Sequence, residues 1–191
     1  MMDRLFRPFR RNESGTAVVE LVLVLPIMLW AYLALFTYWD AYRVLNTTQK
    51  ASYTIADMIS RFDTLDPADF PGMQDVLEYM IGDREGAKMR ITAVVWSDRD
   101  KRFNVQWSCS PGNAKSVWNT ALLNADTGIK GRIPSLDDGE WSVIVETWVD
   151  FVPAMDLSSL PVSTPLEPRT FHQFIATRPR PGKTNLTNRC E

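Results

Sequence analysis

A run of apolar residues near the N-terminus constrains this chain more than any other feature. Residues 16–39 read TAVVELVLVLPIMLWAYLALFTYW and contain one charged residue, Glu20. An α-helix rises about 1.5 Å per residue, so roughly 20 apolar residues cross the hydrocarbon core of a bilayer. The run has this length and therefore predicts a transmembrane helix over residues 16–39.

The residues on either side of the run predict its orientation. Four arginines precede it, which by the positive-inside rule places the N-terminus in the cytoplasm. Aromatic residues gather at its other end, as they do at membrane–water interfaces. The rest of the chain is therefore expected outside the cytoplasm. Two alternatives stay open: a cleaved secretory signal, which has a shorter apolar core, and a buried helix of a soluble domain.

Composition limits what the rest of the chain can be. The 191 residues are 45% hydrophobic and 23% charged, which is typical of a globular domain and excludes disorder over the whole chain. The net charge of −2 argues against a nucleic-acid binder that depends on bulk positive charge. Two Cys and one His cannot supply a four-ligand Cys/His zinc site, so no metal or cofactor is expected.

Two residues inside the apolar run are candidates for a special role. A carboxylate is costly in hydrocarbon, so Glu20 either reaches the cytoplasmic headgroups or is reserved for a positive charge on a partner. Pro26 removes one backbone hydrogen bond and predicts a kink in the helix, although proline is also tolerated in membrane helices.

The start of the run has a recognisable pattern. A basic leader ends in Gly15, the helix begins with Thr16, and Glu20 stands at the fifth position from Thr16. This pattern resembles the class III prepilin signal, and in particular the TadE/TadG-like family of Tad (tight adherence, Flp-type) pilus assembly proteins of minor pilin or pseudopilin type. The resemblance implies cleavage between Gly15 and Thr16 by a prepilin peptidase, and recognition by Glu20 of the amine freed on a neighbouring subunit. Leu21 departs from the pattern, since major pilins usually have an aromatic residue there.

The resemblance also implies a function and partners. It implies a structural or assembly component of a Tad-type pilus, anchored in the bacterial inner membrane with its C-terminal domain in the periplasm, that helps pilus biogenesis and surface adherence. The implied partners are other pilins, Tad assembly-platform proteins and membrane lipid, and not nucleic acid. No enzymatic activity is expected, because the single His172 has no nucleophile at a recognisable spacing. The alternatives are a single-span extracytoplasmic binding or sensor protein and an anchored enzyme that uses carboxylates alone.

Helical spacing continues beyond the apolar run. Residues 40–62 predict an amphipathic stalk helix with one apolar stripe, formed by Val44, Thr48, Ala51, Ile55, Met58 and Phe62. Residues 63–67 end this helix. A second helix is expected from about residue 69 to Gly82, with Met73, Val76, Leu77, Met80 and Ile81 on its buried side.

Period-two alternation predicts four strands. They are expected at residues 89–95, 102–109, 141–149 and 170–177, with a short helix capped by Ser116 between the second and third. Alternation indicates a sheet with one solvated face and one face covered by the stalk. The predicted fold class is α+β and pilin-like: a long transmembrane-plus-stalk helix packed on an antiparallel sheet of about four strands. The predicted organisation is a leader (1–15), a transmembrane helix (16–39), a stalk (40–62) and an extracytoplasmic α+β domain (63–191).

The two cysteines complete the sequence predictions. Outside the cytoplasm Cys109 and Cys190 are expected to form a disulfide that attaches the C-terminal tail to the sheet. The alternative is two free thiols in a reducing compartment.

Overall fold

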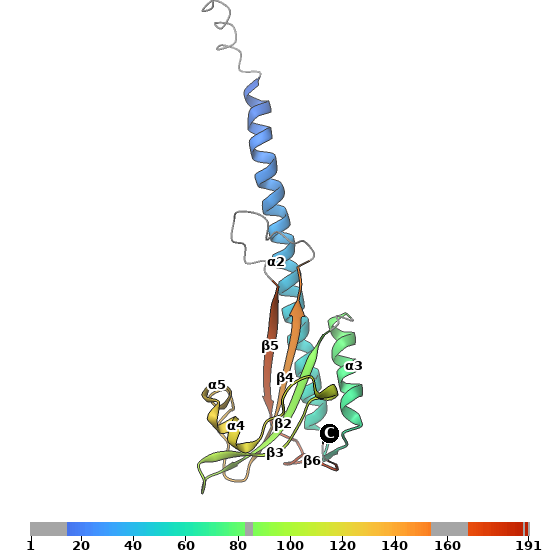
Figure 1. Ribbon diagram of the computed structural model, residues 1–191, viewed down its shortest axis with the longest axis vertical. Helices are drawn as coiled ribbons and strands as arrows, with labels where there is room; N and C mark the ends of the chain where they lie inside the picture. The colour runs from blue at the N-terminus through green and yellow to red at the C-terminus, as the bar shows by residue number, and fades with distance from the viewer. Residues whose placement is uncertain (1–14, 83–85, 154–167, 189, 191) are drawn as a thin grey trace, which may run out of the picture. The chain divides into compact units, whose positions relative to one another are not determined.

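The computed structural model describes residues 15–82, 86–153, 168–188 and 190. These residues form an α+β structure with a long N-terminal helix and a four-stranded antiparallel sheet (Figure 1), as the sequence predicts. The chain divides into two compact units, residues 1–41 with 153–167 and residues 42–152 with 168–191. Of the predicted basic leader, only Gly15 lies within the described residues.

Helix α2 extends from Thr16 to Ser60 and belongs to both units. All residues from Thr16 to Leu29 are exposed, although nearly all of them are apolar. Within the part of the chain that the structure describes, α2 is the one helix long and apolar enough to cross a membrane. The helix continues through Pro26 without interruption, and a kink at this residue stays a prediction.

The part of α2 in the second unit, from Tyr42 onward, buries one side. The predicted stripe is confirmed at four positions, and small residues extend it; the buried set is Val44, Thr48, Ala51, Ser52, Ile55, Ala56, Ile59 and Ser60. The prediction is wrong at Met58, which lies at the margin of the stripe, and at Phe62, which is exposed. Phe62 lies beyond the end of the helix at Ser60, so helical spacing no longer determines its direction.

The sheet contains β2 (Lys88–Ser97), β3 (Arg102–Cys109), β4 (Trp141–Phe151) and β5 (Arg169–Thr177). The strand order is β3-β2-β4-β5, and every neighbouring pair is antiparallel. All four predicted strands are present, and three of them extend one or two residues beyond the predicted limits.

Two helices cover one face of the sheet. The Ser52 hydroxyl of α2 lies 2.7 Å from the Thr147 hydroxyl of β4, which fixes the helix to this face. Helix α3 (Asp69–Ile81) covers the same face, where its Phe70 ring packs against Trp107 of β3 at a centroid distance of 6.1 Å. Ala51, the neighbour of Ser52 in α2, is fully buried.

The other face of the sheet is also covered, so the predicted solvated face is wrong. The chain between β3 and β4 contains η2 (Pro111–Asn113), α4 (Thr120–Ala125) and α5 (Thr127–Lys130). It forms a second core with the sheet, made of Val94, Phe103, Leu123, Ile133, Leu136 and Ile144. The alternation of apolar and polar residues within the strands cannot predict that this face is covered, because the covering residues belong to an irregular segment outside the strands.

Two helix details also differ from the sequence predictions. In α3 the buried row is Phe70, Met73, Leu77 and Ile81, whereas Val76 is exposed and Met80 is half-buried. Gly82 ends α3 as predicted, in a left-handed conformation with φ of 82°. The cap of α4 is Asn119 and not Ser116, since the Asn119 side chain accepts a hydrogen bond from the Leu122 N–H.

Candidate functional site

The start of α2 contains the residues that the prepilin resemblance singles out. The α-helix begins at Thr16, directly after Gly15. A Cβ added at Gly15 would meet no atom within 4 Å, so the backbone around the predicted cleavage bond is open. Glu20 is exposed, and its carboxylate makes no hydrogen bond or ion pair with any described residue.

The surroundings of Glu20 are apolar. Val19 and Leu21 on either side are 59% and 60% exposed, and Leu23 and Val24 on the next turn are also exposed. An exposed apolar surface of this length needs lipid or other apolar helices around it. An acid held in such surroundings favours a cationic partner.

The opposite end of α2 is held by the C-terminal tail of the chain. The last carbonyl groups of a helix have no partner within the helix. The Arg180 N–H donates to the Ser60 carbonyl at 2.7 Å, and the Thr184 hydroxyl donates to the Phe62 carbonyl at 3.1 Å. The tail therefore completes the hydrogen bonding of the helix end.

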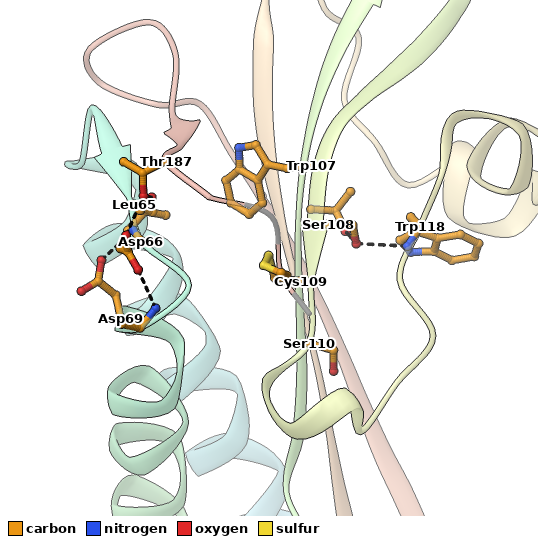
Figure 2. Close-up of a disulfide and its surroundings, with 12 residues drawn as sticks. Leu65, Asp66, Asp69, Trp107, Ser108, Cys109, Ser110, Trp118 and Thr187 are labelled. Carbon is orange, nitrogen blue, oxygen red and sulfur yellow. Dashed lines mark hydrogen bonds between the residues drawn. A yellow bond between two sulfur atoms is a disulfide. The ribbon is translucent and has the colours of Figure 1, made fainter.

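A small parallel sheet continues this attachment. Strand β1 (Thr64–Leu65) pairs with β6 (Asn185–Leu186). The sequence predicts only a helix stop at residues 63–67, where β1 lies. Two-residue strands have no measurable period, so no sequence pattern could predict them. Beside them, the Ala68 N–H and the Thr187 hydroxyl donate to the Asp66 carboxylate and hold its pKa below the ordinary value (Figure 2).

A disulfide joins the tail to the sheet. Cys109 at the end of β3 is bonded to Cys190, as the sequence predicts, with a Cα–Cα distance of 5.6 Å and a sequence separation of 81 residues. The Cys109 side chain is buried against the sheet. The indole N–H of Trp107 donates to the Thr184 carbonyl at 2.8 Å and adds a second link between tail and sheet. Figure 2 shows Trp107 and Cys109 on β3.

A buried group of charges on the second face of the sheet was not predicted. Glu146 of β4 is fully buried, and its Oε2 accepts hydrogen bonds from Arg90 Nε at 2.8 Å and from the Trp118 indole at 2.8 Å. Its Oε1 lies 3.3 Å from His172 Nε2, with poor alignment for a hydrogen bond. Burial acts to raise the pKa of Glu146, but His172, Arg90 and Trp118 outweigh it and hold the pKa below the ordinary value.

Aromatic rings enclose this cluster. The Arg90 guanidinium lies over Trp118 at 4.3 Å and over Trp148 at 5.1 Å, and the ring of His172 stacks on Trp148 at 4.7 Å. The Arg90 and Glu146 side chains are 7% and 0% exposed and lie 2.6 Å apart at Nη2 and Oε2, as in a buried structural ion pair. A sequence signal did exist: Arg90 and Glu146 interrupt apolar strands, and a charge in such a strand needs a partner.

A groove runs along the outer edge of β3. Its volume is about 780 Å³, and it is lined by Gln106, Trp107, Ser108, Val117, Trp118, Asn119, Trp141, Asn185, Leu186, Thr187, Asn188 and Cys190. Among the described residues no group of three or more His, Cys, Asp or Glu side chains could hold a metal ion.

Comparison of the chain with protein-family models, curated proteins and solved structures finds no match. The function is therefore argued from the residues and the fold alone.

Proposed function

We propose that this protein is a minor pilin-like structural or assembly component of a Tad-type pilus, anchored in the inner membrane of a bacterium. The observation that carries the proposal is the start of α2 from Thr16 to Leu29, which is exposed, almost entirely apolar and interrupted by one acid, Glu20, at the fifth position from Thr16. The four arginines before Gly15 favour a cytoplasmic N-terminus. The second unit, residues 42–152 with 168–191, then lies in the periplasm and is called the outer unit below.

The proposed role of Glu20 is electrostatic. Cleavage after Gly15 would free the α-amine of Thr16, and such an amine is cationic at neutral pH, with a typical pKa near 8. In an apolar environment its attraction to a carboxylate is much stronger than in water. An incoming subunit with a free amine would therefore satisfy Glu20 of its neighbour, and no covalent chemistry is required.

The mature N-terminus tests the processing step. The protein is extracted from the membranes of the producing bacterium, and its intact mass and N-terminal sequence are measured. A chain that begins at Thr16 supports prepilin processing. A chain that begins beyond Trp39 would identify an ordinary secreted protein and would contradict the membrane anchor. A chain that begins at Met1 would leave an uncleaved anchor and would rule out the Thr16 amine of a second copy of this chain as the partner of Glu20.

Substitution of Glu20 tests the assembly step. We expect Glu20→Ala to abolish incorporation into pili, measured by immunoblot of sheared filaments, while membrane insertion is unchanged. Asp75→Ala is the control, because Asp75 is an exposed acid on α3 with no partner among the described residues. Normal pili from the Glu20→Ala chain would show that the carboxylate has no role in assembly.

One observation favours a second candidate function. The groove along β3 is a concave surface of the size that small-molecule sites have, about 300–1,000 Å³. An extracytoplasmic binding protein with a single membrane anchor would use such a groove. This candidate predicts that Glu20→Ala leaves the biological activity intact.

A further inference from the structure

The end of the sheet where β4 stops carries an exposed apolar side chain. In β2 to β5, which the structure describes in full, no large apolar residue is exposed. Val152, the first residue after β4, is 65% exposed. A single exposed valine is ordinary on a protein surface, so its place in the fold decides what it means.

The direction of the sheet relative to α2 follows from the tail. The Arg180 N–H, three residues after the end of β5 at Thr177, donates to the carbonyl of Ser60, the last residue of α2. The C-terminal end of β5 therefore lies beside the C-terminal end of α2. Because β4 and β5 are antiparallel, the C-terminal end of β4 points the other way, back along α2 toward Tyr42.

A contact between α2 and β4 fixes the level of each residue along the helix. The hydroxyls of Ser52 and Thr147 lie 2.7 Å apart. A strand rises about 3.4 Å per residue and a helix about 1.5 Å, so Phe151 lies about 14 Å beyond Thr147 and Val44 about 12 Å before Ser52. Phe151 and Val44 are 2% and 5% exposed, which is consistent with their facing each other between strand and helix.

The same count places Val152 near the level of Tyr42. Val152 lies about 17 Å from Thr147 along the strand, and Tyr42 lies about 15 Å from Ser52 along the helix. Tyr42 is 57% exposed and follows the predicted transmembrane helix, residues 16–39, by three positions. A tyrosine at this place is typical of a membrane–water interface, where its ring lies among the lipid headgroups. Val152 is therefore expected at the depth of the headgroups.

We propose that Val152 contacts the headgroup layer of the surrounding phospholipid bilayer. The outer unit then touches the membrane at this end of its sheet as well as through α2. An apolar side chain that the fold leaves exposed gains free energy when it leaves water for the boundary of the acyl chains. The inference rests on the membrane anchor of the proposed function and adds a second membrane contact, which the anchor itself does not supply.

The test uses the full chain in lipid nanodiscs. Methyl groups of Val and Leu are labelled with ¹³C, and a nitroxide is attached to the headgroup of a small fraction of the phosphatidylcholine. Broadening of each methyl signal in NMR spectra then reports how near that methyl is to the membrane surface. We expect at least tenfold stronger broadening for Val152 than for Leu122, with both signals assigned by alanine substitution.

Leu122 is a matched control within the outer unit. It is 51% exposed and lies on α4, whose Asn124 side chain accepts a hydrogen bond from the Phe103 N–H. Phe103 pairs with Trp96, near the end of β2 that is opposite to Val152. Leu122 is therefore as exposed as a membrane contact must be, but far from the proposed one.

A third signal separates failure of this inference from failure of the anchor. Leu25 is 54% exposed in the apolar segment and is expected to be broadened by a nitroxide placed in the acyl chains. If Leu25 is broadened and Val152 is no more broadened than Leu122, the inference is overturned and the anchor stands. If neither nitroxide broadens Leu25, the anchor is wrong and both proposals fall.

The variant Val152→Asp tests whether the valine itself makes the contact. A carboxylate is costly at the boundary of the acyl chains, so this end of the sheet is expected to move away from the membrane. Headgroup broadening of the Val149 signal should then fall at least twofold, with thermal unfolding unchanged because residue 152 is exposed. Leu122→Asp is the control and should leave the Val149 signal as it is. An unchanged Val149 signal in Val152→Asp overturns the assignment of Val152 as the contact.

Discussion

The two ends of α2 differ in which side chains are exposed, although they belong to one continuous helix. Up to Leu29 every side chain is exposed, and nearly all are apolar. From Val44 onward the helix carries polar residues on several sides, yet Thr48 and Ser52 are among its most buried residues. The first half has no preferred side and suits a surrounding apolar medium, whereas the second half has one side that only its own sheet covers. Burial in α2 therefore follows position around the helix from Val44 onward and is absent from Thr16 to Leu29.

The largest expected effect comes from the same truncation made in each half. Ile55 is fully buried and Ile27 is 66% exposed. Ile55→Ala removes packed atoms and is expected to lower the free energy of unfolding of the outer unit by about 2–5 kcal/mol. Ile27→Ala is the matched control and is expected to change it by less than about 0.5 kcal/mol. Chemical denaturation in nanodiscs measures both, and equal losses would mean that the two halves are not distinct.

The second largest expected effect follows from loss of the disulfide. It lowers the stability of the outer unit, which contains the buried half of α2. Cys190→Ser with Cys109→Ser releases the tail that completes the end of α2, and the loop involved spans 81 residues. The outer unit is expected to lose about 2–4 kcal/mol of stability, which thermal unfolding with and without reductant measures. Membrane association should stay the same, because it depends on the exposed half. Release of the variant from membranes by carbonate would contradict this separation.

The smallest of the three effects is a dependence of the stability of the outer unit on acid, to which Glu146 contributes. Because the pKa of Glu146 is lower in the folded unit than in the unfolded chain, its ionised form stabilises the fold at neutral pH. That contribution is fully present above the unfolded pKa and is lost as pH falls through the folded pKa. We expect Glu146→Gln to flatten the decline of stability at acidic pH. Equal profiles for wild type and Glu146→Gln in an acid titration followed by circular dichroism would contradict the assignment.

The elements that could be predicted from the sequence differ from those that could not in the length of their repeating pattern. Long periodic segments were predictable: α2, α3 and the four strands each repeat a pattern over eight or more residues. The second core over the sheet was not, because Leu123, Ile133 and Leu136 lie in short or irregular segments without a period. The strand pair β1–β6 depends on backbone groups brought together from distant parts of the chain, which no local pattern encodes.

The candidate sites differ in the same way. The start of α2 could be found because Gly15, Thr16 and Glu20 are close in sequence. The Arg90–Glu146 pair is separated by 56 residues, and the groove combines residues from β3, the segment before α4 and the tail. Alternation predicted one solvated face for the sheet, but Arg90 is buried on the face that the segment between β3 and β4 covers. Sites assembled from distant segments require the fold before their residues can be associated.

The attachment of the tail has a consequence for biosynthesis. The strand that pairs with Thr64–Leu65, the donors for the final turn of α2 and the second cysteine all follow β5 in the chain. The outer unit can therefore reach its native state only once the chain has been synthesised as far as Cys190. Until then β3 and the helix end lack their partners. A chain truncated after β5 would be expected to keep helix α2 and the sheet but to be vulnerable to quality-control proteases.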